Sequence, residues 1–226
     1  MNTKSRHWVF ERGILYGMDV YRTIPYGSPK VHATFEEIKS NNVSELSEAM
    51  ATPSSSILTR LATQRRCFAA RVENHIAAYG WVSQTNECIG EHEREIQLQP
   101  REAYIWDCAT LKEFRGKRLY SALLSHIVGV LCNEGITRVW IGSSLTNLPS
   151  LKGFSNAGFQ PVVTLISFRF GAMRCCFAIG HSAAPNHLVD AARRALVTKQ
   201  ERMWGPLVVA TSSPEPCPPC AEIESA

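Results

Sequence analysis

The hydrophobic pattern changes its period several times after residue 67, and this change constrains the fold more than any other feature of the sequence. Two segments rich in β-forming residues, Cys67–Val72 and His75–Ser83, are separated only by Glu73-Asn74, which predicts a tight hairpin. Strand patterns with helical patterns between them follow as far as residue 180. The predicted order is β-β-β-α-β-α-β-β, which indicates a mixed α/β (α+β) fold around a mostly antiparallel sheet.

The elements after the hairpin follow from strand propensity, from apolar residues spaced four apart and from glycines placed where helices end. Leu119, Leu123, Ile127 and Leu131 recur on one helix face. We expect strands over Glu95–Leu98, Ala103–Thr110, Ile136–Ile141, Pro161–Phe170 and Met173–Ile179, and helices over Gly116–Glu134 and Asn147–Ala157.

The segment before residue 67 is less regular. Its clearest signal is Thr34-Phe35-Glu36-Glu37, a capping box that predicts a helix running toward Met50. Apolar residues on one face predict a second, short helix over Ser56–Gln64. Residues 1–33 give no usable pattern, because two prolines and a glycine interrupt the periodicity.

The sequence changes character again at His181. An amphipathic pattern predicts one helix over Leu188–Met203, and the Pro-rich stretch after Thr211 buries too little apolar area to offset its ordering entropy. We expect a main domain over residues 1–180, clearest over 67–180, a helical C-terminal extension over 181–210 and a disordered tail over 211–226. Cys217 and Cys220 form a CxxC without a second pair or a histidine partner, so we expect no metal or redox site there.

Composition and charge argue against several classes of protein. The 226 residues include 24 lysines and arginines against 20 acidic residues, and a net charge of +4 disfavours a dedicated nucleic-acid binder. Charges interrupt the N-terminal apolar residues, and no uncharged apolar run approaches the roughly 20 residues that a membrane-spanning helix needs. Without an export signal, the eight cysteines are expected to be reduced thiols. We therefore expect a cytoplasmic protein with no nucleic-acid or membrane partner.

A basic loop joins the strand that ends at Thr110 to the long helix. Its residues are Arg115-Gly116-Lys117-Arg118, and the N–H groups at the helix start have no intrahelical partner. Together with the helix dipole they favour an anion such as a pyrophosphate, while Gly116 permits close approach and the basic side chains add charge-assisted contacts. From this loop alone, a solvated basic loop capping an ordinary helix explains the residues equally well.

A second motif decides between these two interpretations. Asn147-Leu148-Pro149-Ser150 is followed by Phe154 and then by Gly158-Phe159. With Arg115–Tyr120, this pairing resembles the GNAT-type N-acetyltransferases, whose acetyl-CoA loop reads Arg/Gln-x-x-Gly-x-Gly/Ala and whose later motif reads Asn-x-x-Ser/Ala-x-x-x-Tyr, then Gly-Phe. Either motif alone is weak, but both at this separation with the matching β/α order are fairly specific. The resemblance spans about residues 67–180.

The resemblance implies an acyl-CoA-dependent N-acyltransferase that moves acetyl from acetyl-CoA to a primary amine by direct attack in a ternary complex, without a metal. The implied acceptor is a small-molecule or peptide amine, and neither residues 1–64 nor the loop Asn86–Gln99 reveals its identity. A homodimer is also compatible with the resemblance. The implied cofactor-binding residues are Cys108, Ala109, Thr110, Arg115, Gly116, Lys117, Arg118, Leu119, Tyr120, Ser121, Asn147, Ser150 and Phe154.

The catalytic residues implied by the resemblance are Asp107 and Asn147. A backbone amide near Cys108–Thr110 would hold the oxyanion, and Asn147 would help to hold the pantetheine arm. Asp107 is the candidate acceptor of the amine proton, and its alternative role is that of a partly buried acid bonded to nearby backbone. Four glutamates precede it in a charged loop, namely Glu87, Glu91, Glu93 and Glu95.

Three residues depart from the family pattern. Arg118 stands where glycine is usual, so its side chain has to point outward, and Tyr120 replaces a small residue. Phe154 replaces a tyrosine that often protonates the departing thiolate, and a positioned acid contributes about 10²–10⁴ in rate. A catalytically weak or silent acyl-CoA-binding or interaction module therefore stays open as the alternative function.

Overall fold

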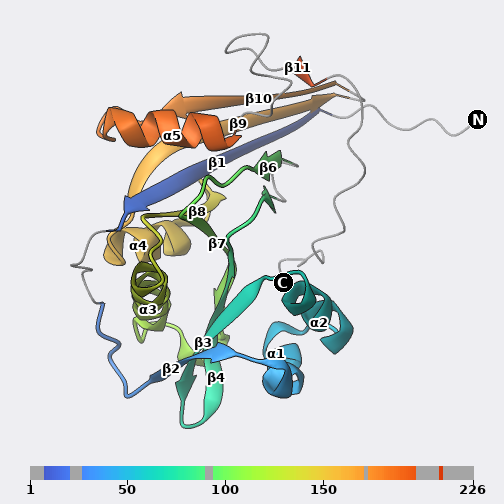
Figure 1. The fold of residues 1–226 in the computed structure, drawn as a ribbon, viewed down its shortest axis with the longest axis vertical. Coiled ribbons are helices and arrows are strands. Elements are labelled where there is room, and N and C mark those ends of the chain that lie inside the picture. Colours follow the sequence, from blue (N-terminus) through green and yellow to red (C-terminus); the bar gives the residue numbers. More distant parts are fainter. Residues whose placement is uncertain (1–7, 21–26, 90–93, 171–172, 197–208, 211–226) are drawn as a thin grey trace, which may run out of the picture.

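The computed structural model describes residues 8–20, 27–89, 94–170, 173–196 and 209–210. Within them, nine strands form one sheet in the order β11-β10-β9-β1-β8-β7-β4-β3-β2, and β5 and β6 form a separate ribbon (Figure 1). The neighbouring strands in these residues run antiparallel, except that β7 and β8 are parallel. The predicted mixed α/β fold with a mostly antiparallel sheet is confirmed.

The elements have the following bounds. The strands are β1 (Trp8–Asp19), β2 (Thr34–Ile38), β3 (Arg66–Val72), β4 (His75–Ser83), β5 (Glu87–Ile89), β6 (Arg94–Ile96), β7 (Glu102–Thr110), β8 (Arg138–Ser144), β9 (Gln160–Phe170), β10 (Met173–Gly180) and β11 (Val209–Ala210). The helices are α1 (Val43–Met50), α2 (Ser54–Ala62), α3 (Leu119–Asn133), α4 (Leu148–Asn156) and α5 (Asn186–Leu196), with single turns η1 (Ser40–Asn42) and η3 (Lys112–Phe114).

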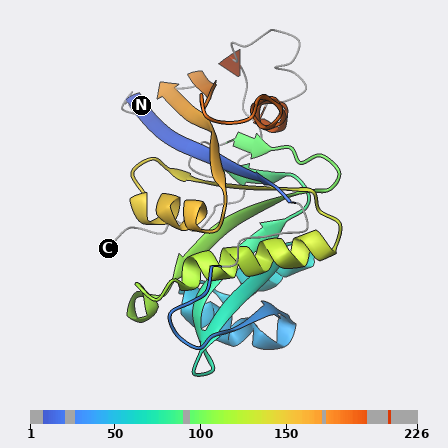
Figure 2. The same ribbon diagram turned by 90° about the vertical axis from the view of Figure 1, so that its left-hand side faces the viewer.

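Helices cover both faces of the sheet, and the central strand β1 shows how the faces are divided. In Figure 2, α3 and α4 lie in front of the strands. Ile14 and Tyr16 belong to the core under these two helices, whereas Leu15 belongs to the core under α5. Successive strand residues point to opposite faces, so both faces of β1 are buried. The helices α1 and α2 lie on the same face of the sheet as α5 and cover β3 and β4. The partly buried Trp106 packs against the core under α5 and against the core under α1 and α2.

The helix predicted from Thr34 toward Met50 is wrong in its first half. Thr34–Ile38 forms the edge strand β2, which pairs antiparallel with β3. The two glutamates of the expected capping box bind arginines across this pairing instead, Glu36 to Arg71 and Glu37 to Arg66. Because a neighbouring strand supplies these partners, tertiary pairing overrides the local signal, and the helix begins only at Val43.

The strand β1 is absent from the sequence-based prediction, although it lies in the centre of the sheet. Its segment Gly13–Met18 is a continuous apolar run without alternation, which is the pattern of a strand buried on both faces. Its register pairs Leu15 with Gly142 of β8 and with Val163 of β9. These partners are remote in sequence, so no local signal indicates the strand.

Several other predictions need adjustment. The segment predicted as a strand over Glu95–Leu98 contributes β6 to the two-stranded ribbon and not to the main sheet. The C-terminal helix is described as far as Leu196, and its buried face is the predicted apolar one. The rest of the range to Met203, the tail and Cys217, Cys220, Glu91 and Glu93 lie outside the described residues. No helix of the described part is long and apolar enough to cross a membrane.

Candidate active site

The two parallel strands separate toward their carboxyl ends. β7 pairs with β8 only as far as Ile105 and Ile141. From there β8 follows β1 to Ser144, while β7 follows β4 to Thr110. The edge of β7 that faces β8 therefore has no β8 ladder bonds over Cys108–Thr110, and its backbone groups are those predicted to bind an acyl-CoA arm.

A bulge in β7 begins where this separation begins. Asp107 has a left-handed φ of 43°, and the register between β4 and β7 shifts between Tyr79 and Trp81. The bulge turns Trp106 and Asp107 toward α2 and leaves Cys108 against the core under α3. Bulges of this kind redirect side chains and are frequent next to active sites.

The basic loop after β7 adopts the geometry of an anion site. Gly116 has a φ of 78°, and Arg118 has a φ of 60° immediately before α3 begins. A Cβ at Gly116 would meet no atom within 4 Å, so this stretch of backbone is open to a ligand. Successive amides around left-handed residues at a helix start favour an anion, and Arg115 and Arg118 are exposed beside them.

The left-handed conformation explains why glycine suits position 118. An L-residue there bears about 1–2 kcal/mol of steric cost, and the Arg118 side chain projects into solvent as expected. Two other predicted cofactor residues are buried, so only their backbone amides are available. Leu119 packs in the core, and the Ser121 hydroxyl donates to the Arg118 carbonyl at 3.2 Å.

A segment that sequence reasoning did not connect with this loop lies against it. The amide of Lys30 donates to the carbonyl of Lys117 at 2.9 Å, and the amide of Gly27 donates to Ser125 Oγ at 3.4 Å. The segment Gly27–Lys30 thus fixes the first turns of α3 and places the backbone of Lys30 against the basic loop. No periodic pattern could have indicated it.

The second motif forms the start of α4. Asn147 Oδ1 accepts a hydrogen bond from the amide of Ser150 at 3.3 Å, so Asn147 is the N-cap of this helix. Phe154 is only 1% exposed, and its ring meets Tyr16 edge-on at 5.3 Å and stacks with Tyr120 at 6.2 Å. Asn147 therefore positions α4, and Phe154 is a core residue of the helix that the motif begins.

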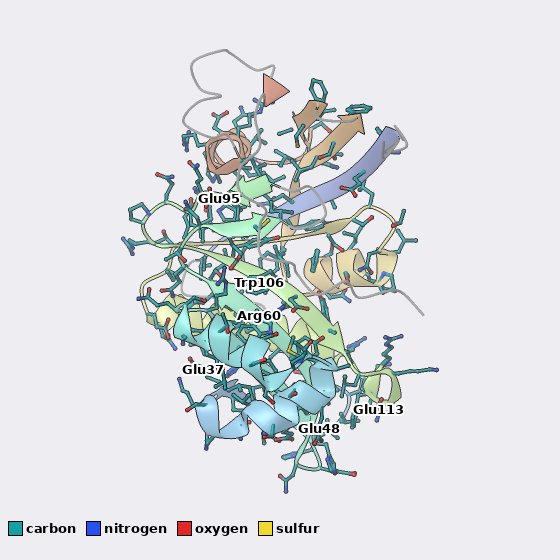
Figure 3. All side chains as sticks on the ribbon, turned by 90° about the vertical axis from the view of Figure 1, so that its right-hand side faces the viewer. Glu37, Glu48, Arg60, Glu95, Trp106 and Glu113 are labelled. Carbon is teal, nitrogen blue, oxygen red and sulfur yellow. The ribbon has the colours of Figure 1, made fainter. Side chains whose placement is uncertain are left out.

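Asp107, the carboxylate predicted to accept the amine proton, forms an ion pair. Arg60 Nη1 donates to Asp107 Oδ2 at 2.5 Å, and both side chains are mostly buried. The guanidinium lies 5.1 Å from the Trp81 ring centroid and 4.9 Å from that of Trp106. Arg60 and Trp106 are labelled next to each other in Figure 3. Asp107 is thus bonded to a side chain and not to nearby backbone. Sequence reasoning missed Arg60, although its position three residues after the buried Ile57 puts it on the inner side of α2.

The thiols near the bulge are protonated. Burial, with a smaller contribution from Asp107, raises the pKa of Cys108, whose Sγ donates to the Trp106 carbonyl at 3.3 Å. Burial also raises the pKa of Cys67 well above its ordinary value. A thiolate is the reactive form of cysteine, so neither side chain suits a covalent acyl intermediate. No group of three or more potential metal ligands occurs in the described parts of the chain.

Of the four glutamates predicted before Asp107, the structure describes Glu87 and Glu95. Burial alone would raise the pKa of Glu87, but hydrogen bonds from Arg65 and Ser83 hold it below its ordinary value. Glu95 is exposed on β6. Glu87 is therefore a structural carboxylate, and Asp107, which directly precedes the open edge Cys108–Thr110, stays the candidate proton acceptor.

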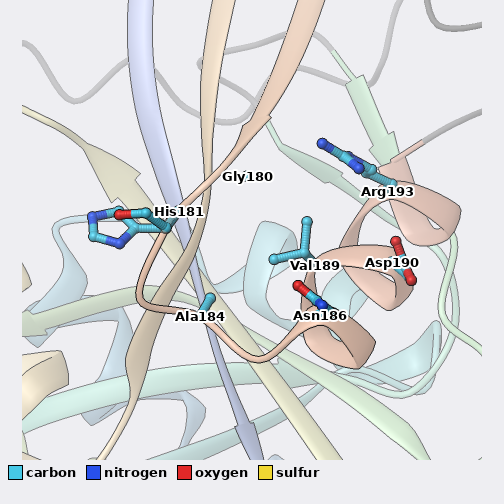
Figure 4. A pocket seen from close by; sticks show the side chains of 8 residues that line it. Gly180, His181, Ala184, Asn186, Val189, Asp190 and Arg193 are labelled. Atoms are coloured by element: carbon cyan, nitrogen blue, oxygen red, sulfur yellow. The ribbon is translucent and has the colours of Figure 1, made fainter.

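A separate hollow of about 340 Å³ lies between β10 and α5. His181, Asn186, Asp190 and Arg193 contribute polar side chains to its walls (Figure 4). Gly180 is required beneath it, because a Cβ there would approach Val189 Cγ1 to 2.8 Å. The hollow shares no residue with the bulge, the basic loop or α4.

The separated parallel strands, the bulge and the basic helix start together have the arrangement of an acetyltransferase fold. A sequence model described as the acetyltransferase (GNAT) family matches residues 32–159, which is more than half of the chain. The chain belongs to the GNAT acetyltransferase family. The matched range contains the bulge, the basic loop and the start of α4.

Solved structures give the same result for the fold. An acetyltransferase of the GNAT family from Colwellia psychrerythraea aligns with a TM-score of 0.52 and 12% identity over 72% of this chain and 56% of its own. A GCN5-related N-acetyltransferase from Sphaerobacter thermophilus aligns with a TM-score of 0.53 and 11% identity over 71% of this chain and 51% of its own.

A third structure is the GCN5-related glucosamine N-acetyltransferase region of a fungal multi-domain GH3 β-N-acetylglucosaminidase. It aligns with a TM-score of 0.54 and 17% identity over 70% of this chain and 21% of that chain. The chain therefore spans little more than half of the first two proteins and a fifth of the third. Among curated protein sequences no match was found.

Proposed function

We propose that the protein is an acyl-CoA-dependent N-acyltransferase that moves acetyl from acetyl-CoA to a primary amine of a small molecule or peptide. The observation that carries this proposal is the continuity of two features. The edge of β7 freed from β8 leads within a few residues to the left-handed, basic start of α3. One end of an extended thioester could pair with the strand while its pyrophosphate rests on the helix start.

The cofactor contacts follow from this placement. Amides of residues 116–121 and the side chains of Arg115, Lys117 and Arg118 would hold the phosphates. The backbone of Cys108–Thr110 would pair with the pantetheine arm, and the start of α4 at Asn147 and Ser150 would border it. Because Asn147 already caps α4, its contribution is to position that helix.

Acetyl transfer would proceed by direct attack of the neutral amine on the thioester carbonyl. The amide that follows the bulge would stabilise the developing oxyanion, since backbone donors fixed in place cost no reorganisation. Arg60 engages Oδ2 of Asp107, and no hydrogen bond among the described residues reaches Oδ1. Asp107 could therefore accept the amine proton through Oδ1 while Arg60 holds its orientation. The protonated state of Cys67 and Cys108 supports direct transfer over a covalent cysteine intermediate.

A second candidate is a weak or silent module that binds acyl-CoA without turnover. The observation that favours it is Phe154, a core residue without a hydroxyl at the position where the family pattern has tyrosine. The two candidates share the cofactor site and differ only in the chemistry.

The test is binding of acetyl-CoA by calorimetry, followed by release of free CoA in the presence of a panel of amines. Acetyl-CoA binding with amine-dependent CoA release supports the transferase. Binding without release for any amine supports the silent module, and absence of acetyl-CoA binding overturns both. The Lys39→Ala variant is a control, because Lys39 is a 65% exposed surface cation paired with Glu37 and distant in sequence from the basic loop.

A further inference from the structure

The departing CoA sulfur needs a proton, and Phe154 cannot supply one. Tyr120 lies in the first turn of α3, and its ring packs flat against α4. A Cβ at Gly153 would lie 2.4 Å from Tyr120 Cδ1 and 2.8 Å from Cε1, so the ring occupies the space that any other residue at position 153 would fill. Tyr120, the departure from the family pattern on α3, is therefore in contact with α4.

The ring of Tyr120 lies against residue 154, where the family pattern has a tyrosine. The ring stacks on Phe154 with a centroid distance of 6.2 Å and an interplanar angle of 29°. Ser150 lies one helical turn before Phe154 on the same helix. Tyr120 thus reaches from one helix to the other, next to the residues at the start of α4 that would border the pantetheine arm.

The surroundings keep this hydroxyl protonated. Burial raises the pKa of Tyr120 well above its ordinary value, and the nearby Cys108 raises it further, while Ser150 opposes the shift. Cys108 belongs to the open edge of β7 and packs against the same core as Tyr120. A protonated phenol near this edge is a hydrogen-bond donor for an atom that leaves the thioester.

We propose, on the basis of the proposed transferase function, that Tyr120 is the general acid for the departing thiolate in place of residue 154. The amine nitrogen forms a bond to the acetyl carbon, and the tetrahedral intermediate breaks its carbon–sulfur bond. The electron pair of that bond stays on sulfur, which takes the proton from Tyr120 Oη. Asp107 takes the proton lost by the amine and passes it to solvent, and the phenolate regains a proton from solvent, so the products are the amide and free CoA.

The test compares Tyr120→Phe with the unchanged protein. The variant keeps the ring, so acetyl-CoA affinity and KM should stay the same, while kcat falls about 10²-fold or more because a positioned acid is lost. The double variant Tyr120→Phe/Phe154→Tyr places a tyrosine at position 154, as in the family pattern, and should restore a large part of kcat. With an acetyl thioester of a more acidic thiol, the deficit of Tyr120→Phe should shrink, since such a leaving group needs less protonation.

Tyr16→Phe is the matched control, because Tyr16 also touches the Phe154 ring and is buried. An equal loss of kcat in this control would assign the effect to loosened packing and overturn the proposal. Full kcat in Tyr120→Phe would also overturn the proposal. If Tyr120→Ala in addition bound acetyl-CoA more tightly, the ring would be an obstacle to the cofactor. If the unchanged protein binds acetyl-CoA yet releases no CoA with any amine, the transferase function and this acid fail together. Thermal unfolding verifies that each variant is folded.

Discussion

Asp107 and Arg118, two charged residues of the site, hold backbone conformations that glycine adopts more easily. Their φ angles are 43° and 60°. Such conformations cost about 1–3 kcal/mol and persist where the surroundings fix them. The Arg60 ion pair fixes the first, and the start of α3 fixes the second. Both residues lie where the proposed cofactor would bind, whereas the other five described non-glycine residues with positive φ lie in turns and at helix ends.

Replacing Arg118 by glycine should move stability and binding in opposite directions. The change relieves the left-handed strain, so the free energy of unfolding in urea should rise by up to about 1 kcal/mol. It also removes a charged contact, so calorimetry should show acetyl-CoA binding weakened by about 1.5–3 kcal/mol. Unchanged or tighter acetyl-CoA binding would contradict a phosphate role for Arg118. Lys39→Ala should change neither quantity.

Asp107→Asn tests the proposed proton acceptor. The amide keeps the size and polarity of the side chain but cannot take a proton from the amine. We expect amine-dependent turnover to fall about 10²-fold or more, with acetyl-CoA affinity retained. Steady-state kinetics and calorimetry on the same preparation separate the two effects. Full turnover in Asp107→Asn would leave the carboxylate only its structural bond to Arg60.

At the scale of elements, the sequence predicted correctly those features, such as tight turns, that depend on residues adjacent in the chain. Glu73 and Asn74 both adopt positive φ and join β3 to β4 as the hairpin prediction required. The capping box at Thr34 wrongly predicted a helix, because its glutamates bind Arg66 and Arg71 of β3. A cross-strand partner about thirty residues away is invisible to a rule that reads four residues.

The candidate site divides in the same way. The basic loop and the start of α4 are contiguous in sequence, so their motifs could be recognised from the residues alone. Arg60 lies 47 residues from Asp107, and Gly27 lies 98 residues from Ser125, so their contacts exist only after folding. The contact of Tyr120 with Gly153 is likewise tertiary, although each residue was visible within a motif.

The contact between α3 and α4 predicts a non-additive pair of substitutions. Gly153→Ala alone should not raise the free energy of unfolding. Alanine gains about 1 kcal/mol from helix propensity, but its Cβ collides with the Tyr120 ring. In a Tyr120→Ala background the same change should be stabilising. Urea unfolding of the four proteins gives the coupling energy directly. Additive effects would show that the two side chains do not meet.

At the scale of the whole molecule, acid should weaken the fold in two stages. Burial lowers the pKa of His126 below 6.5, so stability is full above that value and declines as the unfolded chain takes up a proton below it. The lowered pKa of Glu87 means that its contribution is present above pH 4.5 and is lost as the pH falls through the folded value. Urea unfolding between pH 8 and 3 should show both stages, and His126→Gln should remove the first. A free energy of unfolding that rises between pH 7 and 5 would contradict the sign.

The central place of β1 has a consequence for synthesis. Among the described strands β1 is translated before the others, but Asp19 contacts Arg138 of β8, 119 residues later, and β9 follows later still. Until both partners emerge, the nascent chain carries the apolar run Gly13–Met18 without its ladder, and such long-range pairing is slow. A fragment restricted to residues 32–159 would lack both β1 and β9 and would expose the edge of β8 to pairing between chains. The earliest of the described strands is thus among the last to be placed.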